Sequence, residues 1–143
     1  MSRAPITVTN LTGGYNGTAV IHNCNMQIAA GEIVVIMGGS GSGKSTFLRH
    51  LIGLKPPMEG DVLLFGESLY GVDEIARLRL LKGIGVAFQS GALLSSLTVA
   101  ENVALPLVEH SQLDRETIDV IVRMKLDFVG LLGKEDLLPS ELS

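Results

Sequence analysis

Short segments of alternating apolar and polar residues, separated by glycines, dominate the first part of the chain. Within residues 5–11, isoleucine and valine alternate with threonine, the period of two that is typical of a half-buried strand. Residues 19–29 predict a second strand, and residues 61–66 predict a short third strand between glycines. The intervening residues 12–17 are rich in glycine and predict a turn.

Two continuous apolar runs are typical of strands that are buried on both faces. The first is Ile33–Met37, and the second is Ile84–Gln89, which ends in a polar residue. We therefore expect both runs to form buried strands.

Four helices are predicted from apolar spacing and capping residues. Apolar residues at 47, 48, 51 and 52 share one helix face, and Gly53 followed by two prolines predicts where that helix ends. Asp73 is expected to cap a helix with Ile75, Leu78 and Leu81 on its apolar face.

The other two helices lie in the last third of the chain. The T-x-x-E sequence from Thr98 to Glu101 is a capping box that predicts a helix from residue 99, which Pro106 is expected to kink or end. Asp114 is expected to cap the next helix, where apolar residues at 118, 121, 122, 126 and 129 share a face.

Composition narrows the class of protein. The chain has 143 residues, enough for one domain with a modest core. Its net charge of −4 argues against a nucleic-acid partner, which would favour a basic face. Apolar residues make up 46% of the chain, yet no apolar run reaches the ~18 residues of a membrane span. Cys24 is the single cysteine, so no internal disulfide is expected.

A glycine-rich stretch carries the clearest chemistry. Residues 38–46 match the phosphate-binding pattern G-x-x-x-x-G-K-[ST], between a predicted strand and a predicted helix. Its candidate ligand-binding residues are Gly38, Gly39, Ser40, Gly41, Ser42, Gly43, Lys44, Ser45 and Thr46. The alternative, a flexible linker before a surface lysine, is disfavoured by the regular elements expected on both sides.

The residue types in this stretch suit a nucleoside triphosphate. Glycines let successive backbone N–H groups point at phosphate oxygens, and the following helix adds its unpaired N–H groups. Lys44 is expected to contact the β- and γ-phosphates, and the Ser45 hydroxyl to bind Mg²⁺. We therefore expect this chain to bind a nucleoside triphosphate with magnesium.

Two further features have alternative interpretations. Tyr15 is either a platform on which an adenine ring stacks or an ordinary packed aromatic, and the local sequence alone favours the latter. Leu93, Leu94 and Leu97 lie in a loop rich in serine and glycine. They indicate either a surface that docks against another protein or a loop tucked onto its own core.

In this order, the motifs resemble those of the ATPase subunits of ABC transporters. The family has an aromatic residue about two dozen residues before its phosphate loop, where Tyr15 stands, and a glutamine at the end of a later strand, where Gln89 stands. The resemblance implies that Tyr15 stacks on the adenine of ATP. It also implies that Gln89 contacts Mg²⁺ or the attacking water, and that Lys44 and Gln89 act in hydrolysis.

The same resemblance implies an α/β fold of the P-loop NTPase class. Residues 1–143 would form the N-terminal part of one ABC ATP-binding domain. Residues 5–89 would hold an antiparallel β subdomain and the phosphate-loop core, and residues 90–143 the Q-loop and part of the helical subdomain. Implied partners are a membrane permease contacted through the Q-loop region, a second ATP-binding subunit, and a small regulatory subunit. The implied location is peripheral, on the cytoplasmic face of the inner membrane.

Several stretches are similar to one branch of that family, the ATPases of the Mla-type (toluene-tolerance) systems that move phospholipid between bacterial envelope membranes. They are residues 88–93, 102–103, 106–107, 109–110, 112–113 and 139–143. This similarity implies a role in phospholipid transport.

The sequence departs from the family pattern at its end. Leu142 and Ser143 match the first two residues of the family's L-S-G-G-[QM] signature, and the Walker B carboxylates and switch histidine would follow later. We therefore expect these residues to bind MgATP weakly at best and not to hydrolyse it, and we expect Ile33–Met37 to leave an unpaired edge. The alternatives are a nucleotide-binding module without turnover or a soluble P-loop kinase.

Overall fold

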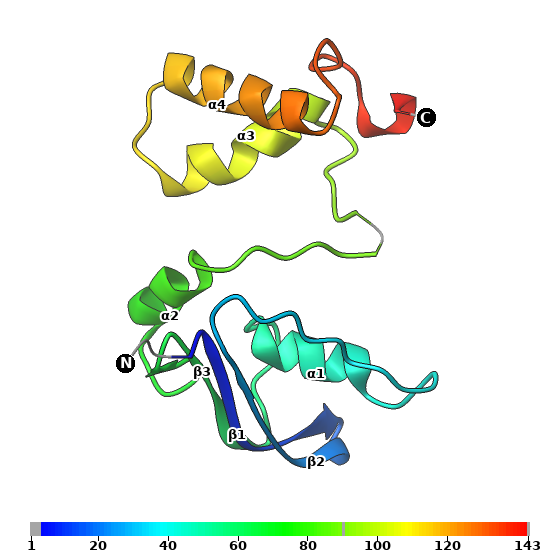
Figure 1. Ribbon diagram of the computed structural model, residues 1–143, viewed down its shortest axis with the longest axis vertical. Coiled ribbons are helices and arrows are strands. Elements are labelled where there is room, and N and C mark those ends of the chain that lie inside the picture. The colour runs from blue at the N-terminus through cyan, green and yellow to red at the C-terminus, as the bar shows by residue number, and fades with distance from the viewer. Residues whose placement is uncertain (1–3, 90, 143) are drawn as a thin grey trace. The chain divides into compact units, whose positions relative to one another are not determined.

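The computed structural model describes residues 4–89 and 91–142, which form two compact units (Figure 1). The first unit ends at Val86 and the second begins at Ala87. The first contains a β-sheet with two helices, and the second contains two helices and a short 3-10 turn. Among the described residues, no helix has the length and hydropathy needed to cross a membrane.

A four-stranded antiparallel sheet forms the first unit. Its strands are β1 (Ile6–Tyr15), β2 (Thr18–Ile28), β3 (Glu59–Leu64) and β4 (Glu67–Ser68), in the order β2-β1-β3-β4. The three predicted strands are confirmed. The predicted turn over residues 12–17 is wrong in extent, because β1 continues to Tyr15 and the turn consists of Asn16 and Gly17 alone. Both turn residues have positive φ (48° and 79°), as a two-residue Asn-Gly hairpin turn requires.

Glycines allow β1 to continue through this region, because they lie where backbone and helix approach the strand closely. A Cβ on Gly13 would lie 2.2 Å from His50 Nε2, and one on Gly14 would lie 1.9 Å from the carbonyl oxygen of Thr18. The glycines therefore serve close packing here, whereas from sequence they predict a turn.

Helix α1 (Lys44–Leu51) packs against β1 and β2 and supplies part of the core. Gly53, with φ of 76°, follows the C-cap residue Ile52, so the predicted helix end is confirmed. The buried apolar residues of this unit form one cluster: Val8, Leu11, Phe47, Leu51, Val62, Leu64, Leu69 and Leu80.

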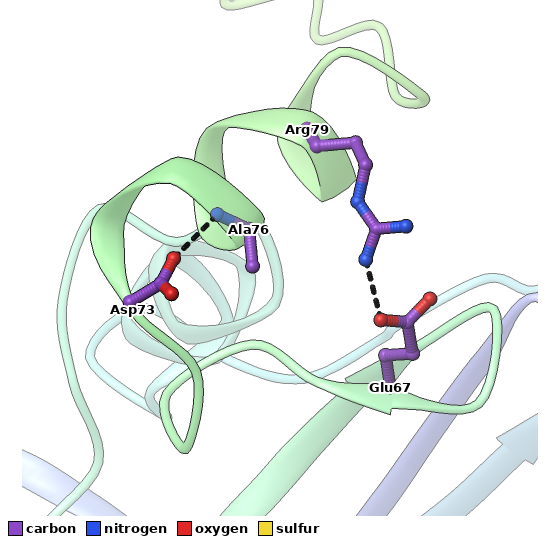
Figure 2. A network of polar contacts seen from close by, with 4 residues as sticks. All are labelled: Glu67, Asp73, Ala76 and Arg79. Carbon is purple, nitrogen blue, oxygen red and sulfur yellow. Dashed lines mark hydrogen bonds and ion pairs between the residues drawn. The ribbon is translucent and has the colours of Figure 1, made fainter.

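Helix α2 (Glu74–Leu81) begins as predicted. The Asp73 carboxylate accepts a hydrogen bond of 2.8 Å from the backbone N–H of Ala76, and Arg79 forms an ion pair of 2.5 Å with Glu67 (Figure 2). The predicted apolar face is confirmed only at Leu81, which packs against the core cluster. Ile75 and Leu78 are 83% and 52% exposed, and Leu80, which is not predicted on this face, is buried. Only the last turn of α2 packs against the core cluster, so the apolar residue of its first turn remains in solvent.

Both apolar runs that predict buried strands lack regular structure. Ile33–Met37 belongs to no strand, and Ile33 is 91% exposed. Ile84–Gln89 is also without a strand, and the carbonyl of Phe88 accepts a hydrogen bond of 3.0 Å from Gly91 N–H in a turn. A strand needs a ladder partner, and within residues 4–89 and 91–142 the sheet provides none for either run. Ile33–Met37 is therefore not the buried strand that its composition predicts, and the predicted strand edge does not form because the run is no strand.

In the second unit, two helices lie side by side (Figure 1). They are α3 (Val99–His110) and α4 (Arg115–Phe128), followed by the 3-10 turn η1 (Pro139–Glu141). Their buried contact consists of Val99, Ile118, Val122 and Leu126.

Local capping chemistry fixes the starts of both helices, as predicted. Thr98 and Glu101 form a reciprocal capping box with distances of 2.7 and 3.2 Å, and Asp114 accepts a hydrogen bond of 2.8 Å from Thr117 N–H. The predicted end at Pro106 is wrong, because α3 continues to His110. Leu107, one residue after the proline, packs against the core of this unit, and this contact favours continuation of the helix.

Candidate nucleotide-binding site

The phosphate loop leads directly into the N-terminus of α1. Gly43 is the N-cap residue and has a φ of 89°, which only glycine adopts readily. The first helical hydrogen bond runs from Phe47 N–H to Gly43 C=O at 2.8 Å, so the N–H groups of residues 44–46 precede it. No side chain caps these N–H groups. The arrangement provides a cluster of backbone donors at the positive end of the helix dipole, which suits an anion.

Lys44 extends back across this loop. Its Nζ donates hydrogen bonds of 2.7 Å to the carbonyl oxygens of both Gly38 and Gly39, and lies 3.4 Å from Ser42 Oγ. A full positive charge is therefore held within the loop, beside the free N–H groups. This position suits a ligand with several negative oxygens.

A cavity of about 300 Å³ connects the loop with the predicted aromatic platform. Its lining residues are Tyr15, Val20, Gly41, Ser42, Gly43, Lys44, Ser45 and Thr46. The structure thus brings Tyr15 to the loop although Tyr15 and Gly41 are 26 positions apart in the sequence. Gly38, Gly39 and Ser40 lie at the start of the loop and do not line this cavity.

The Tyr15 side chain is surrounded by donors and cations. Its hydroxyl accepts hydrogen bonds from Arg49 Nη1 at 2.6 Å and from Thr46 Oγ1 at 3.4 Å, and Lys55 Nζ lies 3.9 Å from the ring centroid. The Thr46 hydrogen bond, together with the Arg49 hydrogen bond and the two positive charges, lowers the pKa of the phenol. These contacts fix the ring beside the cavity.

Arg49 and Lys55 contact Tyr15 but are not predicted as site residues from the sequence. One local signal for Arg49 exists, because Thr46 and Arg49 are three residues apart on α1 and so share a face. Nothing in the local pattern identifies Lys55, which lies beyond the helix and reaches Tyr15 only through the fold.

The cavity and its donors fit ATP with Mg²⁺. Uncapped N–H groups and Lys44 suit the phosphates, the Tyr15 ring suits the base, and the Ser45 hydroxyl lines the same cavity as a candidate metal ligand. In the described ranges, no cluster of three or more His, Cys, Asp or Glu side chains could hold a metal by itself. A magnesium ion here would therefore depend on oxygens from the triphosphate.

Gln89 and the leucine loop belong to the second unit. Gln89 is exposed and lies in the turn that follows Phe88. Leu93 and Leu94 are 57% and 48% exposed, whereas Leu97 is partly buried. Two apolar side chains of this loop are therefore presented to solvent.

Asn102, another residue that the sequence interpretation misses in this role, holds the leucine loop in place. Its side chain accepts a hydrogen bond from Leu94 N–H at 2.9 Å and donates to the carbonyl oxygens of Leu94 and Leu97, each at 3.0 Å. A single amide from α3 thus fixes both ends of residues 94–97.

Comparison with known proteins identifies the family. The family described as ABC transporter matches residues 21–143. The chain is 39% identical to the intermembrane phospholipid transport system ATP-binding protein MlaF of Haemophilus influenzae, over all of this chain and 54% of that protein. It is also 39% identical to the probable ribonucleotide transport ATP-binding protein mkl of Mycobacterium leprae, over 96% of this chain and 40% of that protein. The chain spans about half the length of the curated relatives it matches.

A solved structure agrees with these sequence matches. The ATP-binding cassette MJ0796, in a dimeric post-hydrolysis state bound to ADP and Pi, superposes with a TM-score of 0.85 at 31% identity. The match covers 96% of this chain and 63% of that one. The phosphate loop, the antiparallel sheet and the helix pair thus occur together in a known cassette, and the chain belongs to the ABC transporter family of ATP-binding proteins.

Proposed function

We propose that this chain binds ATP with Mg²⁺ and is the nucleotide-binding part of a transport ATPase that moves phospholipid. The observation that carries the nucleotide site is the cavity shared by Tyr15 and the phosphate loop. The phospholipid cargo rests on the likeness to MlaF, which extends over the whole chain.

Each site residue has a proposed role. Lys44 would exchange its bonds to the Gly38 and Gly39 carbonyls for the β- and γ-phosphates, while the N–H groups of the loop surround the phosphate oxygens. The Ser45 hydroxyl would be a ligand of Mg²⁺, whose chemistry is to neutralise charge on the phosphates. Tyr15 would stack on the base. Gln89 would contact the metal or the attacking water, as the family resemblance implies.

The second unit would connect the motor to its partners. We propose that exposed Leu93 and Leu94 dock on a membrane permease, so that the protein lies on the cytoplasmic face of the membrane. A second ATP-binding subunit would complete the motor, in keeping with the dimeric state of the MJ0796 cassette. A small regulatory subunit remains a proposal from family resemblance.

Removal of the Lys44 charge tests the nucleotide site. In the full-length protein, Lys44→Ala should weaken MgATP binding by about tenfold to a hundredfold, because a charge-assisted bond to phosphate is lost. Isothermal titration measures the affinity, and Lys82→Ala, which removes an exposed lysine on α2's C-cap, is the control. Equal MgATP affinity in wild type and Lys44→Ala would refute the nucleotide site.

A second candidate cargo follows from the likeness to mkl, whose name refers to ribonucleotide transport. The full-length protein with its membrane subunits, placed in vesicles, should couple ATP hydrolysis to movement of labelled phospholipid. Movement of a labelled ribonucleotide instead would favour the second cargo and leave the ATP site intact.

A further inference from the structure

The Tyr15 ring is held from outside the cavity that it lines. Arg49 and Lys55 both contact Tyr15, yet neither belongs to the cavity lining. The lining beside Tyr15 comes from Val20 and the phosphate loop. Because Lys55 covers one face of the ring, a base that stacks on Tyr15 would use the other face.

Lys55 is itself fixed by a second layer of contacts. Its carbonyl oxygen accepts a hydrogen bond of 2.6 Å from the Tyr70 hydroxyl and one of 2.8 Å from His50 Nδ1. Its backbone N–H donates to the carbonyl of Arg49 at 3.2 Å. The backbone of Lys55 is thus tied to α1 and to Tyr70, and from this anchor its ammonium group reaches the Tyr15 ring.

The surroundings of His50 make this anchor rigid. His50 is fully buried, and its Nδ1 must carry the proton because the Lys55 carbonyl can only accept. The other ring nitrogen lies against Gly13, where a Cβ would come within 2.2 Å of it. The backbone of Lys55 therefore has one well-defined place relative to β1 and α1.

We propose that Lys55 is a positioning residue for nucleotide recognition, which holds the Tyr15 ring from behind so that its free face is aligned for the base. The proposal rests on the proposed function of the cavity as an ATP site. It assigns Lys55 to recognition of the aromatic base, and not to the phosphates.

The physical basis is a cation placed over one face of an aromatic ring. Such contacts contribute roughly 0.5–1 kcal/mol at exposed sites. Arg49 fixes the hydroxyl end of the same ring, so two cations restrict its rotation. A base that stacks on a ring already held in place loses less side-chain freedom than one that must order the ring itself. Lys55 therefore favours binding of ATP but has no effect on a ligand without a base.

The test compares MgATP with inorganic triphosphate in the full-length protein. Lys55→Met keeps the apolar stem of the side chain and removes its charge. It should weaken the binding of MgATP about two- to fivefold, the fold-change of one exposed cation–π contact. The affinity for triphosphate should stay unchanged. Lys82→Met is the matched control, because it makes the same chemical change at an exposed lysine, and it should change neither affinity.

A second readout separates positioning from a general structural effect. The absorbance of ionised tyrosine is followed against pH in wild type and in Tyr15→Phe. The difference between the two curves reports the titration of Tyr15 alone. Loss of the Lys55 charge should raise the pKa of Tyr15, because that charge contributes to its lowering. A variant that merely loosens the fold would weaken the binding of both MgATP and triphosphate.

The outcomes are distinct. Equal weakening of MgATP and triphosphate in Lys55→Met would overturn the proposal, because Lys55 would then act on the phosphates or on the fold. Unchanged MgATP affinity would also overturn it. If triphosphate fails to bind wild type, or Lys44→Ala binds it equally well, the cavity is no phosphate site and the proposed function itself fails.

Discussion

The Tyr70 hydroxyl makes a part-buried polar contact whose removal can be predicted quantitatively. It lies 2.6 Å from the carbonyl oxygens of both His50 and Lys55. A hydroxyl has one proton, so Tyr70→Phe removes one donor shared between two acceptors. Each acceptor keeps another donor: His50 Nδ1 for Lys55, and Gly53 N–H at 3.4 Å for His50. The loss should therefore be that of one ordinary hydrogen bond, about 1 kcal/mol of unfolding free energy.

The same hydroxyl makes a second, pH-dependent prediction. Burial raises the pKa of Tyr70 from 10.0 to about 12, with a further contribution from Asp61 and an opposing one from Arg77. Because the folded-state pKa lies above the unfolded value, ionisation favours the unfolded state. The stability contributed by the neutral phenol is fully present below about pH 10 and is lost as the pH rises toward 12.

The magnitude of that loss is limited by solvent. A shift of this size corresponds to at most ~2.7 kcal/mol, and we discount it to about 1 kcal/mol because the hydroxyl is only part-buried. Tyr70→Phe cannot ionise. The variant should therefore be about 1 kcal/mol less stable than wild type near pH 8, and this difference should shrink toward zero near pH 11.

Urea unfolding of the full-length protein, followed by far-UV circular dichroism, measures both quantities. Only the difference between wild type and variant is used, so other groups that titrate at high pH cancel. Equal stabilities near pH 8 would refute the shared hydrogen bond. A difference that stays constant up to about pH 11 would refute the contribution of phenol ionisation.

Two further substitutions test the platform and the packing behind it. Tyr15→Ala should weaken the binding of MgATP about five- to a hundredfold, as expected for loss of one stacked base, with little effect on the binding of inorganic triphosphate. Titration measures both affinities, and equal losses for the two ligands would contradict stacking. Gly13→Ala places a Cβ 2.2 Å from His50 Nε2 and should cost about 1–3 kcal/mol by overpacking. Thermal unfolding measures the effect, and Gly85→Ala is the control because a Cβ at Gly85 would lie in open space. A Tm of Gly13→Ala equal to that of the control would show that His50 can move aside.

Local chemistry accounts for the parts of the fold that sequence predicts well. Asp73, Thr98 and Asp114 each supply a side-chain oxygen to an N–H group three residues later, as their spacing predicts. These interactions are complete within four residues. They therefore form in the same way wherever the helix lies in the molecule.

Apolar runs carry less information, because burial depends on a partner outside the run. Ile33–Met37 has the composition of a central strand, but composition cannot provide the neighbouring ladder, and the segment is exposed. For the same reason the apolar face of α2 is predicted correctly only at Leu81, because which turn of a short helix reaches the core depends on how the helix is placed. The roles of Gln89 and of the phosphate-loop residues stay predictions, since they concern bound ATP.

The site shows the same division between local and tertiary information. The phosphate loop is recognisable because its glycines, Lys44 and Ser45 must occur at fixed spacing to surround phosphate. Tyr15 is ambiguous from its neighbours alone, and the cavity that it shares with the loop supports the stacking role. Lys55 and Tyr70 carry no local signal, because they contact the site through residues distant in sequence.

The packing of α1 on β1 connects these two kinds of information. Gly13 lies two residues before Tyr15 on β1, and it allows His50 of α1 to approach the strand closely. The same helix presents Thr46 and Arg49 to the Tyr15 hydroxyl. The distance between helix and strand therefore sets both the core and the position of the base platform. Substitutions at Gly13, which does not line the cavity, should alter the ratio of ATP to triphosphate affinity as well as stability, because a displaced α1 separates the phosphate loop from the ring.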